Sequence, residues 1–300
     1  AQDLRPGEYF GSFWSEKAYH APLLDWHGGG SHHHRGAGSA GLAFYLTGDK
    51  ELQYRAEHAF DWLASRQKPR GGWTEIQNNE TDSDWEFTGM EELSNIETSF
   101  AIRGIAQAIQ QGLPPKKSYL DAMRKAGLWY IGLETPAWSG AFPHHERSPY
   151  DTLNGTMHAV EALGFIYSAL KKGYGLRVDI FRAAAFRGLR HLIPQQWDNG
   201  CFPYRSFGGI TINYSALVLY LILNFRDNCL PEEWSEVLRK GVSFLCASLN
   251  SDGSLKWEEN ETSCAKHYVW TYALVFNVFK RMNCRDEAEM ISFSSPLSLS

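Results

Sequence analysis

Several predicted helices begin with side chains that can carry acid–base chemistry, although the helices themselves are otherwise apolar. Tyr and His can donate or accept a proton, while Asn and Arg can hold a developing negative charge. The residues near these helix starts are His32, His33, His34, Arg35, Asn95, Glu97, Asn154, His158, Asn213, Tyr214, His267 and Tyr268. If the starts meet at one rim, they form a site with proton-transfer chemistry.

Each of these residues also has a purely structural interpretation. Asn at a helix start commonly caps the helix by accepting hydrogen bonds from free backbone N–H groups. A single Tyr or His on an apolar face is more often a hydrogen-bonded core residue than a catalyst. The set indicates a site more strongly than any one member does. The three consecutive histidines lack a spacing typical of metal ligands, so we expect neither a metal nor a cofactor.

The elements that would position these residues form a repeated unit, which occurs four times. Each unit has an amphipathic helix, a polar loop in which Gly precedes a large aromatic residue, and a more apolar helix. The amphipathic helices are expected at 50–66, 117–133, 179–193 and 232–249, and the apolar ones at 95–110, 153–170, 211–225 and 266–280. A further apolar helix is expected at 36–46.

Such alternation predicts an all-α fold, an α/α toroid of about four to six helical hairpins around a central cleft. The amphipathic helices suit the outer ring, and the apolar helices suit the inner ring because they are buried on most sides. Parallel inner helices would bring their first residues to one rim. No linker divides the chain, so we expect one domain over 1–300, with 1–30 as a peripheral segment.

Aromatic and polar residues around this rim could contact a ligand. The chain has 11 Trp, 14 Tyr and 17 Phe, and aromatic faces are natural stacking surfaces for sugar rings or for an apolar polyene. A Gly-aromatic turn can also simply close a helix end, which is the simpler explanation of Trp73. The expected substrate-binding residues are Trp73, Asn95, Glu97, His144, His145, Tyr150, Tyr204 and Trp270.

Composition excludes some partners. The net charge of −5 with interspersed signs gives no basic stripe for nucleic acid, and the longest apolar stretch, 210–225, falls short of the roughly 20 residues that span a bilayer. We therefore expect a polysaccharide or oligosaccharide as the partner, and neither nucleic acid nor membrane. The start of the chain would fit a secreted or periplasmic protein whose signal peptide has been removed, and the oligomeric state stays open.

A family resemblance adds to this interpretation. Gly140-Ala141-Phe142-Pro143, Ser148-Pro149 and Leu153-Asn154-Gly155-Thr156-Met157, running into Ala162-Leu163 and Tyr167, are similar to the C-terminal helical domain of heparan glucuronyl C5-epimerases. The layout also resembles α/α-toroid polysaccharide lyases. Both resemblances imply an enzyme that removes the C5 proton of a uronate. We expect no counterpart of the epimerases' preceding β-rich domain within residues 1–300.

This chemistry assigns roles to the rim residues. We expect Asn154 and Arg205 to neutralise the uronate carboxylate. Tyr214 is the first choice for the proton-transfer group and His158, one turn beyond Asn154, the second. Asn213, His267 and Tyr268 complete the expected catalytic set.

Three alternatives stay open. A glycoside hydrolase on this fold would need two carboxylates about 5 to 10 Å apart, for which the acidic segment 80–86, Asp151 and Glu97 are candidates. A terpene-cyclase-like enzyme would use the acids at Asp82-Ser83-Asp84. A non-catalytic glycan-binding toroid would keep the aromatic residues without the polar rim.

Overall fold

The computed structural model describes residues 14–20, 25–32, 34–74, 92–137, 139–148, 151–173, 178–204, 209, 211–229, 234–256 and 269–294. Five inner helices alternate in sequence with five outer helices over these residues. The inner helices are α1 (His34–Leu46), α3 (Asn95–Gln110), α5 (Leu153–Gly173), α7 (Ile212–Cys229) and α9 (Val269–Arg281). The outer helices are α2 (Lys50–Arg66), α4 (Lys117–Leu133), α6 (Asp179–Leu192), α8 (Ser235–Ala247) and α10 (Arg285–Ser294).

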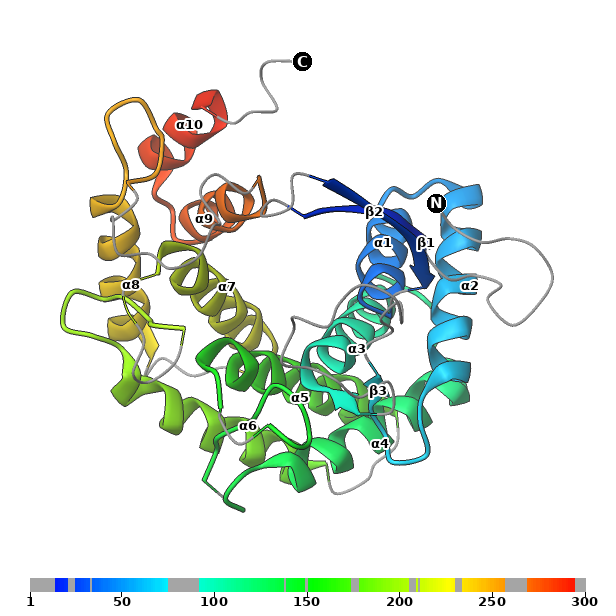
Figure 1. Ribbon diagram of the computed structural model, residues 1–300. Helices are drawn as coiled ribbons and strands as arrows, with labels where there is room; N and C mark the ends of the chain where they lie inside the picture. The colour runs from blue at the N-terminus through cyan, green and yellow to red at the C-terminus, as the bar shows by residue number, and fades with distance from the viewer. Residues whose placement is uncertain are drawn as a thin grey trace.

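The helices form the expected α/α toroid. Each inner helix packs against the next inner helix, from α1 to α3, α5, α7 and α9, and also against the outer helix that follows it. Figure 1 shows the inner helices surrounded by the outer ones. The inner and outer assignments made from the sequence are confirmed, and α10 is an additional outer helix that the sequence pattern did not indicate.

The first residues of the inner helices meet at one rim. The side chain of Asn95, at the start of α3, donates to the backbone oxygen of Gly155 in the first turn of α5 at 2.9 Å. Arg35, in the first turn of α1, binds Glu97 in the first turn of α3. The N–H of Leu153 donates to the carbonyl of Tyr204, in the loop that precedes α7. These contacts require α1, α3 and α5 to run in the same direction.

The loops with Gly and an aromatic residue are bonded to the first turns of the inner helices. The aromatic residues Trp73, Phe142 and Phe202 are fully buried. The backbone N–H of each donates to a hydroxyl on the fourth residue of α3, α5 or α7, namely Thr98, Thr156 and Ser215. This repeated bond fixes the entry to three successive inner helices.

The glycines of these loops contact the neighbouring outer helix. Gly71, Gly140 and Gly200 have φ values of 110°, 80° and 92°, and a Cβ on each would overlap a backbone carbonyl of α4, α6 or α8. Only glycine combines this backbone conformation with so close an approach. The Gly-aromatic pattern is therefore explained by close packing of the loop against the neighbouring outer helix.

Short strands complete the fold. Strands β1 (Trp14–His20) and β2 (Asp25–His32) pair antiparallel, and Figure 1 shows them between α9 and α1. The sequence indicated only a peripheral segment here, because Gly28-Gly29-Gly30 is unfavourable for a strand. Strands β3 (Trp73–Thr74) and β4 (Leu93–Ser94) pair just before α3, and a 3₁₀ turn, η2 (Ile193–Gln195), follows α6.

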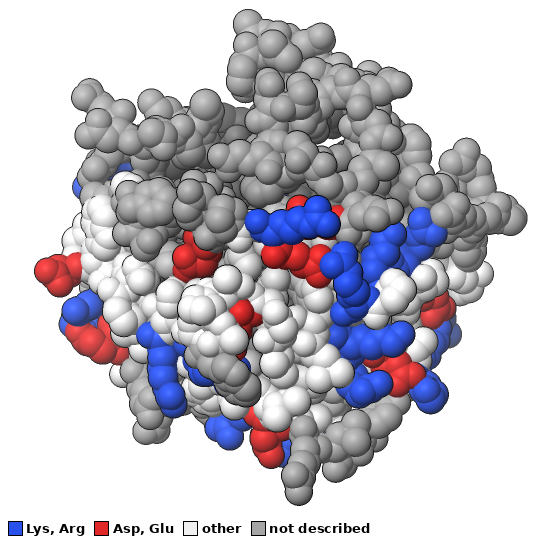
Figure 2. All heavy atoms as spheres, turned by 60° about the horizontal axis from the view of Figure 1, so that its bottom comes forward, with Lys and Arg blue, Asp and Glu red and all other residues white. Residues whose placement is uncertain are grey.

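The outer surface carries charges of both signs. On the face drawn in Figure 2, Lys and Arg side chains are more frequent on one side, with Asp and Glu side chains among them. Several of these charges form ion pairs, such as Lys117 with Asp121 on α4 and Lys116 with Asp61 on α2. Among the described residues, none of the helices is long and apolar enough to cross a membrane.

Candidate functional site

His158 lies at the centre of a polar cluster formed by α3 and α5. Its side chain is 2% exposed, and its Nδ1 lies 3.1 Å from Oγ of Ser99 and 3.4 Å from Nη2 of Arg103. The ring also contacts that of Phe100, with centroids 5.4 Å apart. The partners of His158 are thus residues on α3 that sequence reasoning did not select.

The surroundings of His158 keep its imidazole neutral. Burial holds the pKa of His158 well below its usual range, and the positive charges of Arg103, Arg35 and His144 act in the same direction. Because the Arg103 guanidinium can only donate hydrogen bonds, Nδ1 of His158 must present its lone pair to it. In the neutral ring the proton then resides on Nε2, which makes this atom a hydrogen-bond donor.

Two carboxylates near this cluster are held in ion pairs. Both Glu97 oxygens accept bonds from Arg35: Oε2 from its backbone N–H at 2.6 Å and Oε1 from its Nε at 2.8 Å. Glu161, which is 1% exposed, pairs with Arg103. Each carboxylate is matched by one guanidinium, so these four charges sum to zero.

Glu161 also joins a longer polar layer across the ring. Its Oε2 accepts from Nε of Arg103 at 2.9 Å, and its Oε1 accepts from Nδ2 of Asn224 on α7 at 2.5 Å. Asn224 in turn accepts from Nη1 of Arg281 on α9 at 2.6 Å. This layer connects α3, α5, α7 and α9 beneath His158.

The imidazole rings of His144 and His145 contact each other in the loop before α5. Their Nδ1 atoms lie 2.9 Å apart, and the backbone carbonyl of His144 accepts from the N–H of Asn95. One Nδ1 must hold the proton between them and the other must accept it. The donating ring, if neutral, has an unprotonated Nε2, which can act as a base. His144 is half-buried and His145 is buried.

The aromatic rings of Tyr214 and Tyr204 contact each other. Their ring centroids lie 4.4 Å apart with an interplanar angle of 37°, and both rings are half-buried. Asn213 is buried, and its Oδ1 accepts from the N–H of Tyr214 at 2.9 Å. Because the Tyr204 carbonyl binds Leu153, this aromatic pair lies beside the start of α5.

Asn154 provides an acceptor without an internal partner. Its side chain is 7% exposed, and its buried Oδ1 accepts no hydrogen bond from the described residues. Asn154 does not have the capping role usual for Asn at a helix start, because Oγ1 of Thr152 accepts from the N–H of Gly155 instead. A buried oxygen in this state requires a donor from beyond the described residues, such as a water molecule or a ligand hydroxyl.

Two of the expected substrate-binding residues are fully buried and bonded to the surrounding backbone. Asn95 is fully buried, and its Nδ2 donates to the carbonyls of Pro143 and Gly155, while Ser94 caps α3. Trp73 is fully buried, with its Nε1 bonded to the carbonyl of Leu63. Trp73 leaves no face or donor for a sugar, whereas Oδ1 of Asn95 accepts no hydrogen bond from the described residues. Trp270, on α9, is 39% exposed.

Several sequence expectations lie outside the described residues. These are Arg205, His267, Tyr268 and Tyr150, together with the acidic segment 80–86 that the hydrolase and terpene-cyclase alternatives use. Of the other two hydrolase candidates, Glu97 is bound to Arg35, and Asp151 lies 2.7 Å from Nε2 of His191 on α6.

His34 is turned into the protein, where its Nδ1 lies 2.8 Å from the carbonyl of Thr74. Within the described part of the chain, no group of three His, Cys, Asp or Glu residues is arranged to hold a metal.

The residues that sequence reasoning missed are Ser99, Arg103, Glu161 and Asn224. They lie inside the inner helices rather than at the helix starts. Two signals in the sequence could have identified them. Arg103 and Glu161 are charged residues in otherwise apolar helices. Arg103 also follows Ser99 by four residues, and Glu161 follows His158 by three. Those spacings place each pair on one helix face.

The fold is shared with known carbohydrate enzymes. No protein-family model matches the chain, and no curated protein matches it in sequence. The solved structure of a D-mannose isomerase is similar, with a TM-score of 0.61 at 17% identity over 87% of this chain and 74% of that one. A cellobiose 2-epimerase from Bacillus thermoamylovorans gives 0.64 at 11% identity over 86% and 73%, and a sugar epimerase from a ruminal bacterium gives 0.60 at 15% over 86% and 73%.

A possible member of the GH105 family from Klebsiella pneumoniae has the same architecture, with a TM-score of 0.56 at 13% identity over 73% of this chain and 59% of that one. At these identities the similarity establishes the α/α toroid.

Proposed function

We propose that this protein is an enzyme that acts on a carbohydrate by removing a proton from a sugar carbon and returning it, as an epimerase or isomerase does. The observation that carries the proposal is the neutral His158, whose Nδ1 is held by Ser99 and Arg103. The names of three structural neighbours, an isomerase of D-mannose and two sugar epimerases, support the same substrate class.

The reaction needs three groups. A base removes the proton from a carbon beside a carbonyl, and the electron pair of the broken C–H bond moves onto the carbonyl oxygen. A hydrogen-bond donor stabilises that oxygen. Return of a proton to the opposite face of the same carbon re-forms the carbonyl and gives the epimer. Isomerisation instead returns the proton to the former carbonyl carbon, while the hydroxyl proton of the first carbon moves to the oxyanion, so that the carbonyl forms at the first carbon.

His158 is assigned as the donor to the developing oxyanion. A neutral imidazole can donate through Nε2 without becoming a competing acid, and its lowered pKa keeps it neutral at physiological pH. The sequence-based interpretation named His158 as the second choice for the proton-transfer group, and the present proposal gives it the donor role instead. Asn154 would accept a sugar hydroxyl at its unpartnered Oδ1.

Proton transfer is assigned to Tyr214 and to the His144–His145 pair. In that pair, one neutral ring has an unprotonated Nε2 that can accept a proton. Tyr214 provides a phenol beside the start of α5. An acid and a base on separate elements suit a reaction that uses both faces of one carbon.

A uronate is the second candidate substrate, with the proton removed at C5. The observation that favours it is the convergence of the first turns of α3 and α5 at the rim, since helix N-termini favour negative charge. The sequence-based role of Arg205 in holding the uronate carboxylate is part of this candidate. Hydrolysis is less favoured because the described candidates Glu97 and Asp151 are both paired.

Incubation in D₂O tests the proposal. The protein is mixed with D-mannose, D-glucose, cellobiose and oligouronates, and the products are followed by NMR. We expect deuterium at a carbon beside the sugar carbonyl, or at C5 of the uronate. Formation of an unsaturated uronate would instead indicate β-elimination. New reducing ends without any deuterium incorporation would contradict the proposal and favour a hydrolase.

A further inference from the structure

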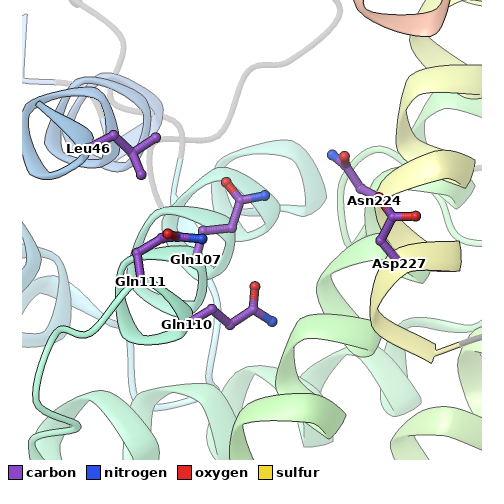
Figure 3. Close-up of a pocket in the computed structure, with 6 residues that line it drawn as sticks. All are labelled: Leu46, Gln107, Gln110, Gln111, Asn224 and Asp227. Carbon is purple, nitrogen blue, oxygen red and sulfur yellow. The ribbon is translucent and has the colours of Figure 1, made fainter. Parts of the chain in front are cut away.

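A cavity lies at the C-terminal ends of the inner helices, whereas the His158 cluster lies nearer their first residues. It has a volume of about 250 Å³ and is lined by Leu46, Gln107, Gln110, Gln111, Asn224 and Asp227. These residues belong to the last turn of α1, the last turn of α3 with the residue after it, and the last turns of α7. Figure 3 shows the glutamines of α3 opposite Asn224 and Asp227 of α7, with Leu46 to one side.

The polar layer described above separates this cavity from His158. Asn224 belongs to both, since it lines the cavity while its Nδ2 donates to Glu161. On α3, Ser99, Arg103 and Gln107 are four residues apart and therefore follow one face of the helix towards the cavity. His158 and the cavity thus lie on opposite sides of the Arg103–Glu161 pair.

One wall of the cavity is fixed. Nη1 of Arg281 donates to Oδ1 of Asn224 at 2.6 Å, and its Nη2 donates to Oδ2 of Asp227 at 2.7 Å. Nε of Arg226 donates to the other oxygen of Asp227 at 3.1 Å. These bonds orient the amide and the carboxylate in advance, and the carboxylate oxygens retain lone pairs for further donors.

The other wall is adaptable. The side chains of Gln107 and Gln111 make no hydrogen bond to another described residue, and each carboxamide has two N–H donors and an acceptor oxygen. Leu46, which is 57% exposed, provides an apolar surface beside them. Amides opposite fixed acceptors, with one apolar side, suit a ligand whose hydroxyls both donate and accept while its C–H groups need an apolar contact.

We propose that this cavity is a second binding site, for one uncharged sugar ring or a polyol of similar size. Its volume is below the range of about 300 to 1,000 Å³ that holds drug-sized ligands. An anion is disfavoured by the C-terminal ends of the helices, which carry partial negative charge. A metal cation is disfavoured because Asp227 is the one carboxylate among the lining residues and is already matched by Arg226 and Arg281.

Binding is tested by isothermal titration calorimetry and saturation-transfer NMR with D-glucose, D-mannose and myo-inositol, and with D-glucuronate as the charged comparison. Gln107→Leu removes one amide at similar side-chain volume, and we expect it to weaken binding of the uncharged ligands about fivefold, as the loss of one hydrogen bond does. Gln195→Leu makes the same change in η2, away from the cavity, and should leave binding unchanged.

His158→Gln separates this site from the proposed reaction site. Uncharged-ligand binding that persists in His158→Gln and weakens in Gln107→Leu supports the second site, whatever the protein does to sugars. Binding that is lost in His158→Gln, is unaffected by Gln107→Leu, or is as strong for glucuronate as for glucose would overturn it. So would the absence of saturable binding in the folded wild-type protein. Turnover in D₂O is measured separately, so that failure of the proposed function leaves these outcomes interpretable.

Discussion

Nη2 of Arg103 lies 3.4 Å from Nδ1 of His158, and the same guanidinium is bound to the buried carboxylate of Glu161. Glu161 therefore holds in place the cation that faces the imidazole. A guanidinium has no acceptor, so it selects the His158 tautomer with its proton on Nε2. Glu161 is a positioning residue in this arrangement, because it acts on His158 through Arg103.

The first prediction concerns the protonation of His158. In ¹⁵N-detected histidine NMR, we expect the His158 ring to remain neutral with hydrogen on Nε2 as the pH falls through the usual range for histidine, because burial lowers its pKa. An Nδ1–H tautomer at neutral pH, or titration at about 6.5, the ordinary value for histidine, would refute the assignment.

The same pKa shift predicts a dependence of stability on pH. A histidine whose pKa is lowered by folding binds more protons in the unfolded state, so the free energy of unfolding rises with pH between the folded and unfolded pKa values. We expect the wild-type Tm to fall as the pH decreases below about 6.5. His158→Gln should reduce the slope by at most about 1.4 kcal/mol per pH unit, measured by thermal melts between pH 5 and pH 8. An unchanged slope would show that His158 titrates alike in both states.

The second prediction tests Tyr214 as a proton-transfer group. Tyr214→Phe retains the ring that packs against Tyr204 but removes the hydroxyl, so the protein should fold normally. Turnover of the sugar identified in D₂O should drop by about 10²- to 10⁴-fold, as is typical when a general acid or base is lost. Tyr204→Phe is the matched control on the other ring of the pair. Equal turnover in Tyr214→Phe and wild type would transfer the role to His144 or His145.

The third prediction concerns the buried ion pair. Glu161→Gln leaves the Arg103 charge, which is 11% exposed, without its carboxylate. Breaking a buried pair in this way costs about 3 to 5 kcal/mol in the free energy of unfolding, measured by urea denaturation. Glu51→Gln breaks the exposed pair with Arg55 on α2 and should cost less than about 1 kcal/mol. Similar costs for the two variants would mean that the Arg103–Glu161 pair is solvated.

The fourth prediction tests the loop glycines as packing elements. Gly200→Ala places a Cβ against the carbonyl of Lys240 on α8 at a φ of 92°. Gly48→Ala places a Cβ on a residue whose φ is 74°, with no heavy atom within 4 Å of the new Cβ. We expect Gly48→Ala to cost about 1 kcal/mol in stability and Gly200→Ala clearly more, because α8 must move. Equal changes in Tm would indicate that the loop adjusts without disturbing the ring.

Much of the fold could be predicted from the sequence because helix periodicity is a local property. The apolar spacing within 95–110, 153–170 and 211–225 identified the inner helices α3, α5 and α7, and the repeated Gly-aromatic loops separated them from the outer helices. Parallel inner helices followed from the repeat. The hairpin at 14–32 was missed because its three glycines are unfavourable for a strand, and the pairing of β1 with β2 could not be read from a local pattern.

The candidate site depended more on tertiary structure. From the sequence, His158 and Tyr214 were recognisable as reactive types at helix starts, whereas no local pattern showed that Asn95 and Trp73 are fully buried. Local patterns cannot show which polar atoms are consumed by distant partners, such as Pro143 for Asn95 or Leu63 for Trp73. The proton position on His158 is decided by Arg103, 55 residues away along the chain. The sequence by itself thus determined the ring of helices and its rim. Tertiary contacts decided which rim residues keep polar atoms available for a ligand.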